Sequence, residues 1–219
     1  MEKYLEILKN CPLFTGIDEK DLLRMLTCLG AKIKFFDKNY AIFSEGMPTK
    51  HIGILLSGEI YTEQTDYYGN RSILSDIKPT QTFGESFSCA EVARLPVQII
   101  ANEPSEVMLI DCSHILHTCH NSCGFHQQLI YNLMKALAQN NVELHQRAEV
   151  TSKRSTREKL LTYLMQQSKK TGKHEFDIPF DRQELADYLE VERSGLSSEI
   201  SKLSKEGILK TQKNHFVIL

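Results

Sequence analysis

The chain of 219 residues contains no tryptophan, and none of its apolar runs is long enough to cross a bilayer. Its charged start, MEKYLEILKN, lacks the apolar core of a secretory signal peptide. Without a secretion signal, the six cysteines favour reduced thiols over a disulfide framework. These features predict a cytoplasmic protein without a membrane segment. Zinc-protease, phosphate-loop, paired-carboxylate and Ser/His/Asp motifs are missing too, so we do not expect an enzyme.

The overall charge of −2 is divided unevenly along the chain. Residues 1–150 hold 13 Lys and Arg against 18 Asp and Glu, whereas residues 151–219 hold 13 against 10. The C-terminal part is therefore positive by three charges, as attraction to nucleic-acid phosphates requires. With 41% hydrophobic residues, the chain can bury a core and is long enough for two domains.

The N-terminal half changes from helical to strand periodicity. Two short helices are expected at 4–8 and 18–29, with Asp18 as a helix N-cap. Short β-rich runs separated by Gly, Pro and Asn turns then follow at 32–36, 40–44, 51–56, 59–65, 71–77, 97–101 and 106–110. This spacing predicts an antiparallel barrel or roll.

A helical period returns at about residue 114 and lasts to about residue 149. Its apolar positions alternate at intervals of four and three, which is a heptad seam: Cys119, Cys123, His126, Ile130, Leu133, Leu137, Asn140 and Leu144. Such a seam predicts a homodimer through the helix at 124–148, with Asn140 setting the register. The alternative is that this helix packs on its own roll.

The C-terminal part contains a helix-turn-helix pattern. After a basic hinge at 153–155, a helix at 156–167 and a strand at 176–179, a short helix is expected at 182–189. Val191 lies in the tight connection, where its side chain is expected to fill the space between the two helices. The second helix begins at Arg193 or Ser194, with Leu196, Ile200 and Leu203 on its buried side. A hairpin at 210–219 forms a wing. This arrangement places one helix in the major groove of double-stranded DNA.

The polar face of the second helix supplies the candidate DNA contacts. Arg193 is the best candidate for a bidentate contact to guanine, although it can equally bind a phosphate alone. Ser194, Ser197 and Ser198 are short enough to approach bases or phosphates. Four basic residues are expected to bind phosphates, which position the protein without reading sequence: Arg182, Lys202, Lys210 and Lys213.

Several short motifs, in this order and spacing, resemble the Crp/Fnr superfamily of bacterial transcription regulators. They are Pro12-Leu13-Phe14, Phe43-Ser44-Glu45-Gly46, Leu56-Ser57-Gly58-Glu59-Ile60, Phe83-Gly84-Glu85, Arg182-Gln183-Glu184-Leu185-Ala186, Arg193-Ser194 and Gly207-Ile208-Leu209. The resemblance implies an α+β protein with a cyclic-nucleotide-binding-like β-roll (1–113), a dimerisation helix and hinge (114–152), and a winged helix-turn-helix (153–219). It further implies a homodimer that binds a palindromic promoter site and contacts RNA polymerase.

The expected effector pocket departs from the family's cyclic-nucleotide sensors. Gly84, Glu85 and Ser86 occupy the start of the phosphate cassette, but Leu95 stands where the sensors carry an arginine, so Gly84-Glu85 can equally be a retained structural turn. The Thr-Ser pair that meets the purine is replaced near Glu143-Leu144, and Ser198 stands where many members carry Arg. Because a buried cyclic phosphate needs a counter-charge, we expect no tight cyclic-nucleotide binding and leave the small-molecule effector open.

Cysteine and histidine are concentrated within fifteen residues: Cys112, His114, His117, Cys119, His120, Cys123 and His126. Thiolate and imidazole are common metal ligands, so a metal-, haem- or thiol-based redox sensor using Cys119, Cys123 and His126 is one alternative. In the simpler interpretation these cysteines are small buried apolar groups and no metal is bound. An alternative from another class is a ligand-sensing module that binds protein instead of DNA.

Overall fold

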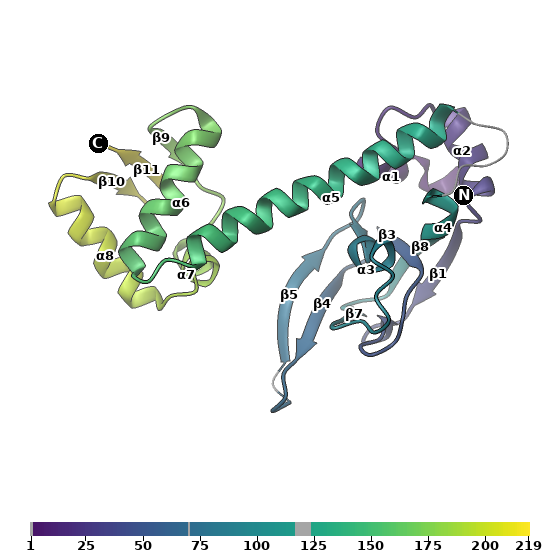
Figure 1. Cartoon of the computed structure of the whole chain (residues 1–219), viewed down its shortest axis with the longest axis horizontal. Coiled ribbons are helices and arrows are strands. Elements are labelled where there is room, and N and C mark those ends of the chain that lie inside the picture. Colours follow the sequence, from purple (N-terminus) through teal and green to yellow (C-terminus); the bar gives the residue numbers. More distant parts are fainter. Residues whose placement is uncertain (1, 70, 117–123) are drawn as a thin grey trace. The chain divides into compact units, whose positions relative to one another are not determined.

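The computed structural model describes residues 2–69, 71–116 and 124–219 (Figure 1). Its contacts divide the chain into two compact units, residues 1–138 and 139–219. The three-part division at 113/114 and 152/153 concerns functional parts and stays a prediction. Among the described helices, none combines the length and apolar character that a bilayer crossing demands.

The N-terminal unit begins with short helices that pack on a strand-rich body. They are η1 (Glu2–Tyr4), α1 (Leu5–Lys9), η2 (Pro12–Phe14) and α2 (Glu19–Cys28). Asp18 occupies the N-cap position of α2 as expected, but its side chain makes no capping hydrogen bond. Leu22, Met25 and Leu26 form the buried side of α2, and the helix thereby covers one face of the roll.

Eight strands form the roll as two antiparallel four-stranded sheets. One sheet has the order β1 (Lys32–Phe36), β8 (Ser105–Asp111), β3 (His51–Ser57), β6 (Thr82–Phe83). The other has the order β2 (Ala41–Phe43), β7 (Gln98–Ala101), β4 (Ile60–Thr65), β5 (Arg71–Ile77). The seven expected strands are confirmed, whereas β6 and the following α3 (Glu85–Cys89) were not anticipated. A second buried apolar cluster of the roll includes Phe43, Phe83 and Leu95.

Two helices follow the roll: α4 (Cys112–Leu116) and α5 (Gly124–Thr151). Leu129 and Leu133 on α5 are fully or almost fully buried in the core of the N-terminal unit, and Leu137 packs partly against it. Near its other end, Val150 belongs to the core of the C-terminal unit. The part of the expected helix at 117–123 lies outside the described residues.

The C-terminal unit is a small helical core closed by a three-stranded sheet. It contains α6 (Thr156–Thr171), α7 (Arg182–Leu189) and α8 (Arg193–Lys205), with strands β9 (Glu175–Asp177), β10 (Leu209–Gln212) and β11 (His215–Ile218) in the order β10-β11-β9. The expected wing hairpin is confirmed as β10 and β11, joined at Lys213 and Asn214. The winged helix-turn-helix expected from the sequence is thus present.

Candidate nucleic-acid interface and effector pocket

A capping box starts the first helix of the pair. The Asp181 carboxylate accepts hydrogen bonds from the backbone N–H groups of Gln183 and Glu184 at 2.7 and 2.8 Å. In return, the Glu184 carboxylate accepts the backbone N–H of Asp181 at 2.7 Å. Such reciprocal bonds satisfy N–H groups that an isolated helix start leaves unpaired. The first residue of α7 is therefore determined locally.

The turn between α7 and α8 is held by backbone and side-chain contacts. Glu190 adopts a left-handed conformation (φ 53°, ψ 56°), which ends α7. The Val191 N–H donates to the Ala186 carbonyl at 3.0 Å, and its side chain packs against the C-terminal core, as predicted. From α6, the Lys159 ammonium donates to the carbonyls of Leu189 and Glu190 at 3.0 and 3.2 Å. Lys159 was not anticipated, because its partners are thirty residues away in sequence.

The two faces of α8 separate as the spacing predicted. Leu196, Ile200 and Leu203 are buried in the C-terminal core. The opposite face exposes the candidate contacts Arg193, Ser194, Ser197, Ser198 and Lys202. No acidic residue lies in the first turn of α8, although the residue before it, Glu192, carries a carboxylate at the N-cap position. An exposed helix face of this composition suits the approach of a polyanion.

Arg157 on α6 pairs with two carboxylates, Glu199 of α8 and Glu206 directly after its end. Its guanidinium lies 3.4 Å from a Glu199 carboxylate oxygen and pairs through both terminal nitrogens with Glu206. The pKa of Glu206 is lowered and that of Arg157 is raised, in both cases mainly by this hydrogen bonding. Lys202 also lies 3.5 Å from Glu199, so its ammonium is shared with α8 itself. Arg157 was missed from the sequence, since its partners are more than forty residues away.

The wing is attached to α7 through Arg182. This guanidinium donates to the Lys213 carbonyl at 3.1 Å and lies 5.6 Å from the centre of the Phe216 ring. Partial burial lowers the pKa of Arg182. Lys210 and Lys213 are exposed, and Lys213 has a positive φ of 55° in the turn. The structure therefore gives Arg182 a contact that positions the wing, in addition to its predicted phosphate contact.

A small hydroxyl-rich pocket in the roll contains the expected effector residues. Gly84 begins α3 with a φ of 76°, and a Cβ there would lie 2.6 Å from the Phe43 ring. Glu85 is 8% exposed and its carboxylate accepts a hydrogen bond from the Thr82 hydroxyl at 3.3 Å. The pocket lining also includes Thr62, Ser75, Ser86 and Phe87.

The two residues nearest the position of the sensors' arginine lie in different surroundings. Leu95 is 2% exposed within the apolar cluster of Phe43 and Phe83, whereas Arg94 is exposed. The position at which the resemblance predicts the counter-charge is thus a buried alkyl side chain, and Leu95 is not among the residues that line the pocket of Gly84 and Glu85.

Of the three candidate metal ligands, the structure describes only His126. Cys119 and Cys123 lie outside the described residues. His126 is 3% exposed and its Nε2 lies 2.8 Å from the Ile115 carbonyl oxygen. Within the described ranges, no three His, Cys, Asp or Glu side chains gather closely enough to hold a metal ion. Cys112 instead contacts Cys89, a residue that the sequence did not single out.

Two family models match the chain. A cyclic nucleotide-binding domain model matches residues 33–122, and a Crp-like helix-turn-helix domain model matches residues 158–219. No curated protein matches the sequence. Together, the two models cover the roll and the winged helix-turn-helix in the order seen in the structure.

Several solved structures share this fold at low sequence identity. The catabolite activator protein of Thermus thermophilus is 19% identical, with a TM-score of 0.51 over 95% of this chain and 93% of that one. DNR from Pseudomonas aeruginosa is 20% identical, with a TM-score of 0.52 over 100% and 95%. The c-di-GMP-responsive regulator CLP of Xanthomonas campestris is 16% identical, with a TM-score of 0.54 over 92% and 99%. At these identities the likeness concerns the fold.

Proposed function

The chain belongs to the Crp/Fnr superfamily of DNA-binding transcription regulators, and from this premise we propose that it acts as a homodimer on a palindromic promoter site. The family is non-enzymatic, so the chain is a regulator and not an enzyme. The observation that supports sequence-specific binding is the exposed polar face of α8, held in place by the α7 capping box and by Lys159. We expect the protein to work in the cytoplasm, together with RNA polymerase.

Arg193 is the proposed reader of base sequence. It is exposed at the first position of α8, where a side chain can reach the floor of a major groove. Ser194, Ser197 and Ser198 lie beside it, and Lys202, Lys210 and Lys213 are proposed to bind phosphates. Arg182 is proposed to do so while it also holds the wing turn.

The proposed dimer forms through α5, but along a seam that differs from the sequence prediction. His126 and Leu133 are buried inside their own chain, so this correction removes them from the face that meets a partner. They were included because heptad spacing alone does not show which helix face the chain itself covers. The exposed or half-buried positions that keep the four-three spacing are Ile130, Met134, Leu137, Asn141, Leu144 and Ala148. Asn140, predicted to set the register, is exposed but lies beside this line and is replaced on it by Asn141.

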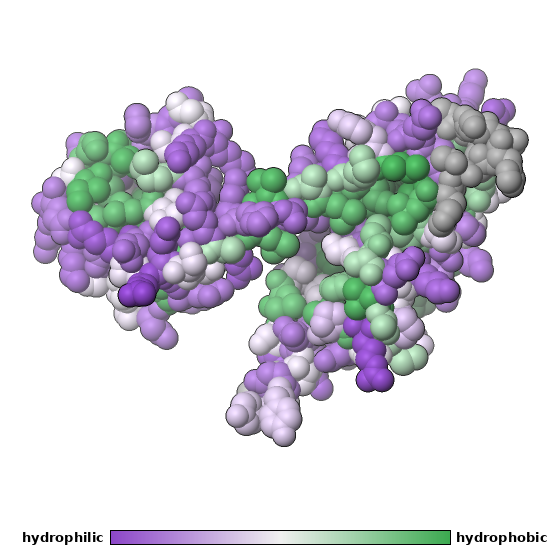
Figure 2. All heavy atoms as spheres, viewed as in Figure 1, coloured by the Kyte–Doolittle hydropathy of each residue, from purple (hydrophilic) through white to green (hydrophobic). Residues whose placement is uncertain are grey.

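Two large apolar side chains of this corrected seam are exposed. Met134 is 59% exposed and Leu144 is 67% exposed, and Figure 2 shows apolar surface along α5 in the N-terminal unit. Side chains of this kind gain free energy when a second copy covers them. A symmetric pair would also present two α8 helices to successive turns of one palindromic site.

The effector that we propose is a small molecule other than a cyclic nucleotide, bound beside Gly84, Glu85 and Ser86. Thr62, Ser75 and Thr82 offer hydroxyl groups there, and Glu85 offers a buried carboxylate. A carboxylate that faces hydroxyl groups suits a ligand with hydrogen-bond donors better than a phosphate, because like charges repel. The buried Leu95 supplies no opposing charge.

A selection of duplexes from a random pool tests this function. The parent protein should enrich a palindrome, and Arg193→Ala should lose discrimination at one base pair of each half-site while it still binds DNA at low salt. The expected loss is about 1–3 kcal/mol of discrimination. Lys169→Ala is the matched control, because it removes one exposed positive charge from α6, remote in sequence from α8. If the parent ignores every duplex at low salt, the ligand-sensing module that binds protein becomes the better interpretation.

A further inference from the structure

Two cysteines of the N-terminal unit lie in direct contact. Cys89 is the last residue of α3 and Cys112 is the first residue of α4, and their sulfur atoms are 3.4 Å apart. A disulfide bond is about 2.0 Å long, so the two atoms need to approach by only about 1.4 Å. Their separation of 23 residues in sequence means that folding, and not local chain geometry, brings them together.

The surroundings give the two thiols different characters. Cys112 is 3% exposed, and burial followed by the contact with Cys89 raises the pKa of Cys112 to about 12. It therefore stays protonated at neutral pH. Cys89 is only half-buried, so a reagent from solvent can reach it.

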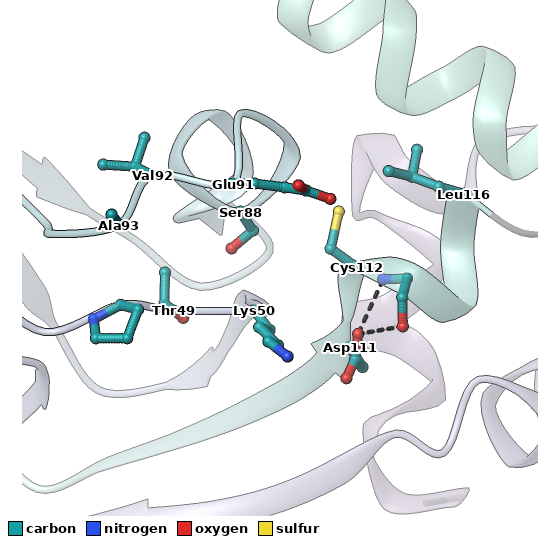
Figure 3. A pocket seen from close by; sticks show the side chains of 11 residues that line it. Thr49, Lys50, Ser88, Glu91, Val92, Ala93, Asp111, Cys112 and Leu116 are labelled. Atoms are coloured by element: carbon teal, nitrogen blue, oxygen red, sulfur yellow. Dashed lines mark hydrogen bonds between the residues drawn. The ribbon is translucent and has the colours of Figure 1, made fainter.

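A cavity of about 350 Å³ lies beside Cys112, which is one of its lining residues. Lys50, Glu91 and Asp111 contribute polar groups to its lining, and Figure 3 shows the Cys112 sulfur projecting among these residues toward Glu91. A molecule as small as hydrogen peroxide fits easily in this space. Cys112 lines this cavity and Cys89 does not, so a small oxidant in the cavity lies beside Cys112, while Cys89 is reached through its own half-buried surface.

We propose that Cys89 and Cys112 form a reversible intramolecular disulfide when the protein meets a hydroperoxide. The Cys89 thiolate attacks one peroxide oxygen, the O–O bond breaks and hydroxide leaves, which produces a sulfenic acid at Cys89. The Cys112 sulfur then attacks the Cys89 sulfur, and water leaves with the proton of the Cys112 thiol. Overall, two thiols lose two electrons and the peroxide is reduced to water. A dithiol reductant reverses the reaction through exchange.

The bond would connect the effector pocket to the end of the roll. Gly84 and Glu85 line that pocket at the start of α3, and Cys89 ends the same five-residue helix. On the other side, the carbonyl oxygen of Ile115 in α4 meets His126 of α5 at 2.8 Å. Oxidation would therefore restrain α3 against α4 and reduce the freedom of the pocket. This switch uses residues other than Cys119 and Cys123.

Thiol counting on the full-length protein tests the proposal directly. Treatment with hydrogen peroxide should lower the thiols counted in denaturant from six to four per chain, and dithiothreitol should restore six. Peptide mapping by mass spectrometry should find Cys89 linked to Cys112. Cys28→Ser is the matched control, since Cys28 is exposed on α2, and this variant should still lose two thiols.

Cys89→Ser and Cys112→Ser should each prevent this loss. Because Cys112→Ser changes a buried residue, circular dichroism is used to check that this variant folds. If it does not fold, peptide mapping of the oxidised parent protein tests the Cys89–Cys112 bond instead. A linkage to any other cysteine, or six thiols remaining after peroxide treatment, overturns the proposal. Amide exchange in the α3 peptide should slow by about tenfold on oxidation, and unchanged exchange there refutes the restraint on the pocket.

Discussion

The substitution Met134→Ala tests which face of α5 meets a second copy of the chain. Met134 is 59% exposed and lies between the half-buried Ile130 and Leu137 on the corrected seam. Full burial of a methionine side chain is worth about 1.5–3 kcal/mol. Since somewhat more than half of this residue remains to be buried, each subunit should lose about 1–2 kcal/mol of association free energy in the variant.

A symmetric dimer contains the substitution twice, which doubles the effect. The total of about 2–3.5 kcal/mol corresponds to a rise of about 30- to 300-fold in the dimer dissociation constant. Sedimentation equilibrium over a range of concentrations measures this constant for the parent and the variant. The secondary structure should not change, because the side chain points away from the core of its own chain.

Val142→Ala is the matched control for this measurement. Val142 is 54% exposed on the same helix, but it lies about a third of a turn away from the seam and should alter the constant by no more than about twofold. If Val142→Ala weakens association as much as Met134→Ala, the seam is wrongly placed. If the parent remains monomeric at every concentration, the dimer itself is refuted.

Three further predictions concern the cap, the wing and the pocket. Asp181→Ala should lower the unfolding free energy of residues 139–219 by about 1 kcal/mol, measured by amide exchange, and Asp181→Asn should retain most of it; equal stability of parent and alanine variant would contradict the capping role. Asp177 and then Glu175 raise the pKa of His215 above its ordinary value of 6.5. The stabilisation that protonated His215 gives the folded state is therefore complete below pH 6.5 and is lost as the pH rises through the raised pKa. NMR titration of the ring should show the raised pKa, and an ordinary pKa would refute this prediction. Calorimetry with cyclic AMP should show no saturable heat, and micromolar binding would overturn the argument from Leu95.

The helix-turn-helix was predictable almost residue by residue because its signals are local. Leu196, Ile200 and Leu203 follow one helix period, which predicted α8. The capping residues Asp181 and Glu184, three positions apart, are an equally local signal that the prediction did not use. The strands of the roll were also predictable, including the short β2 and β7, because turn residues separate their β-rich runs. By contrast, β6 has two residues, and the five residues of α3 carry no apolar period.

The dimer seam and the thiol pair show what a local pattern cannot supply. The heptad spacing on α5 fits more than one face, and only packing against the N-terminal core shows that Leu133 is covered while Met134 is not. Similarly, Cys89 meets Cys112 because the roll brings two short helices together. The Lys159 and Arg157 contacts depend on tertiary structure in the same way.

The position of Arg157 explains how a chain with an excess of acidic residues can still attract a polyanion. Glu199 is the sole acidic residue within α8, and both it and Glu206, which follows the helix, are paired with Arg157. The electric field that approaching DNA meets depends on which charges face outward, and a residue count conceals this. Selection can therefore tolerate carboxylates on a DNA-reading helix, provided that a neighbouring helix keeps a cation behind them.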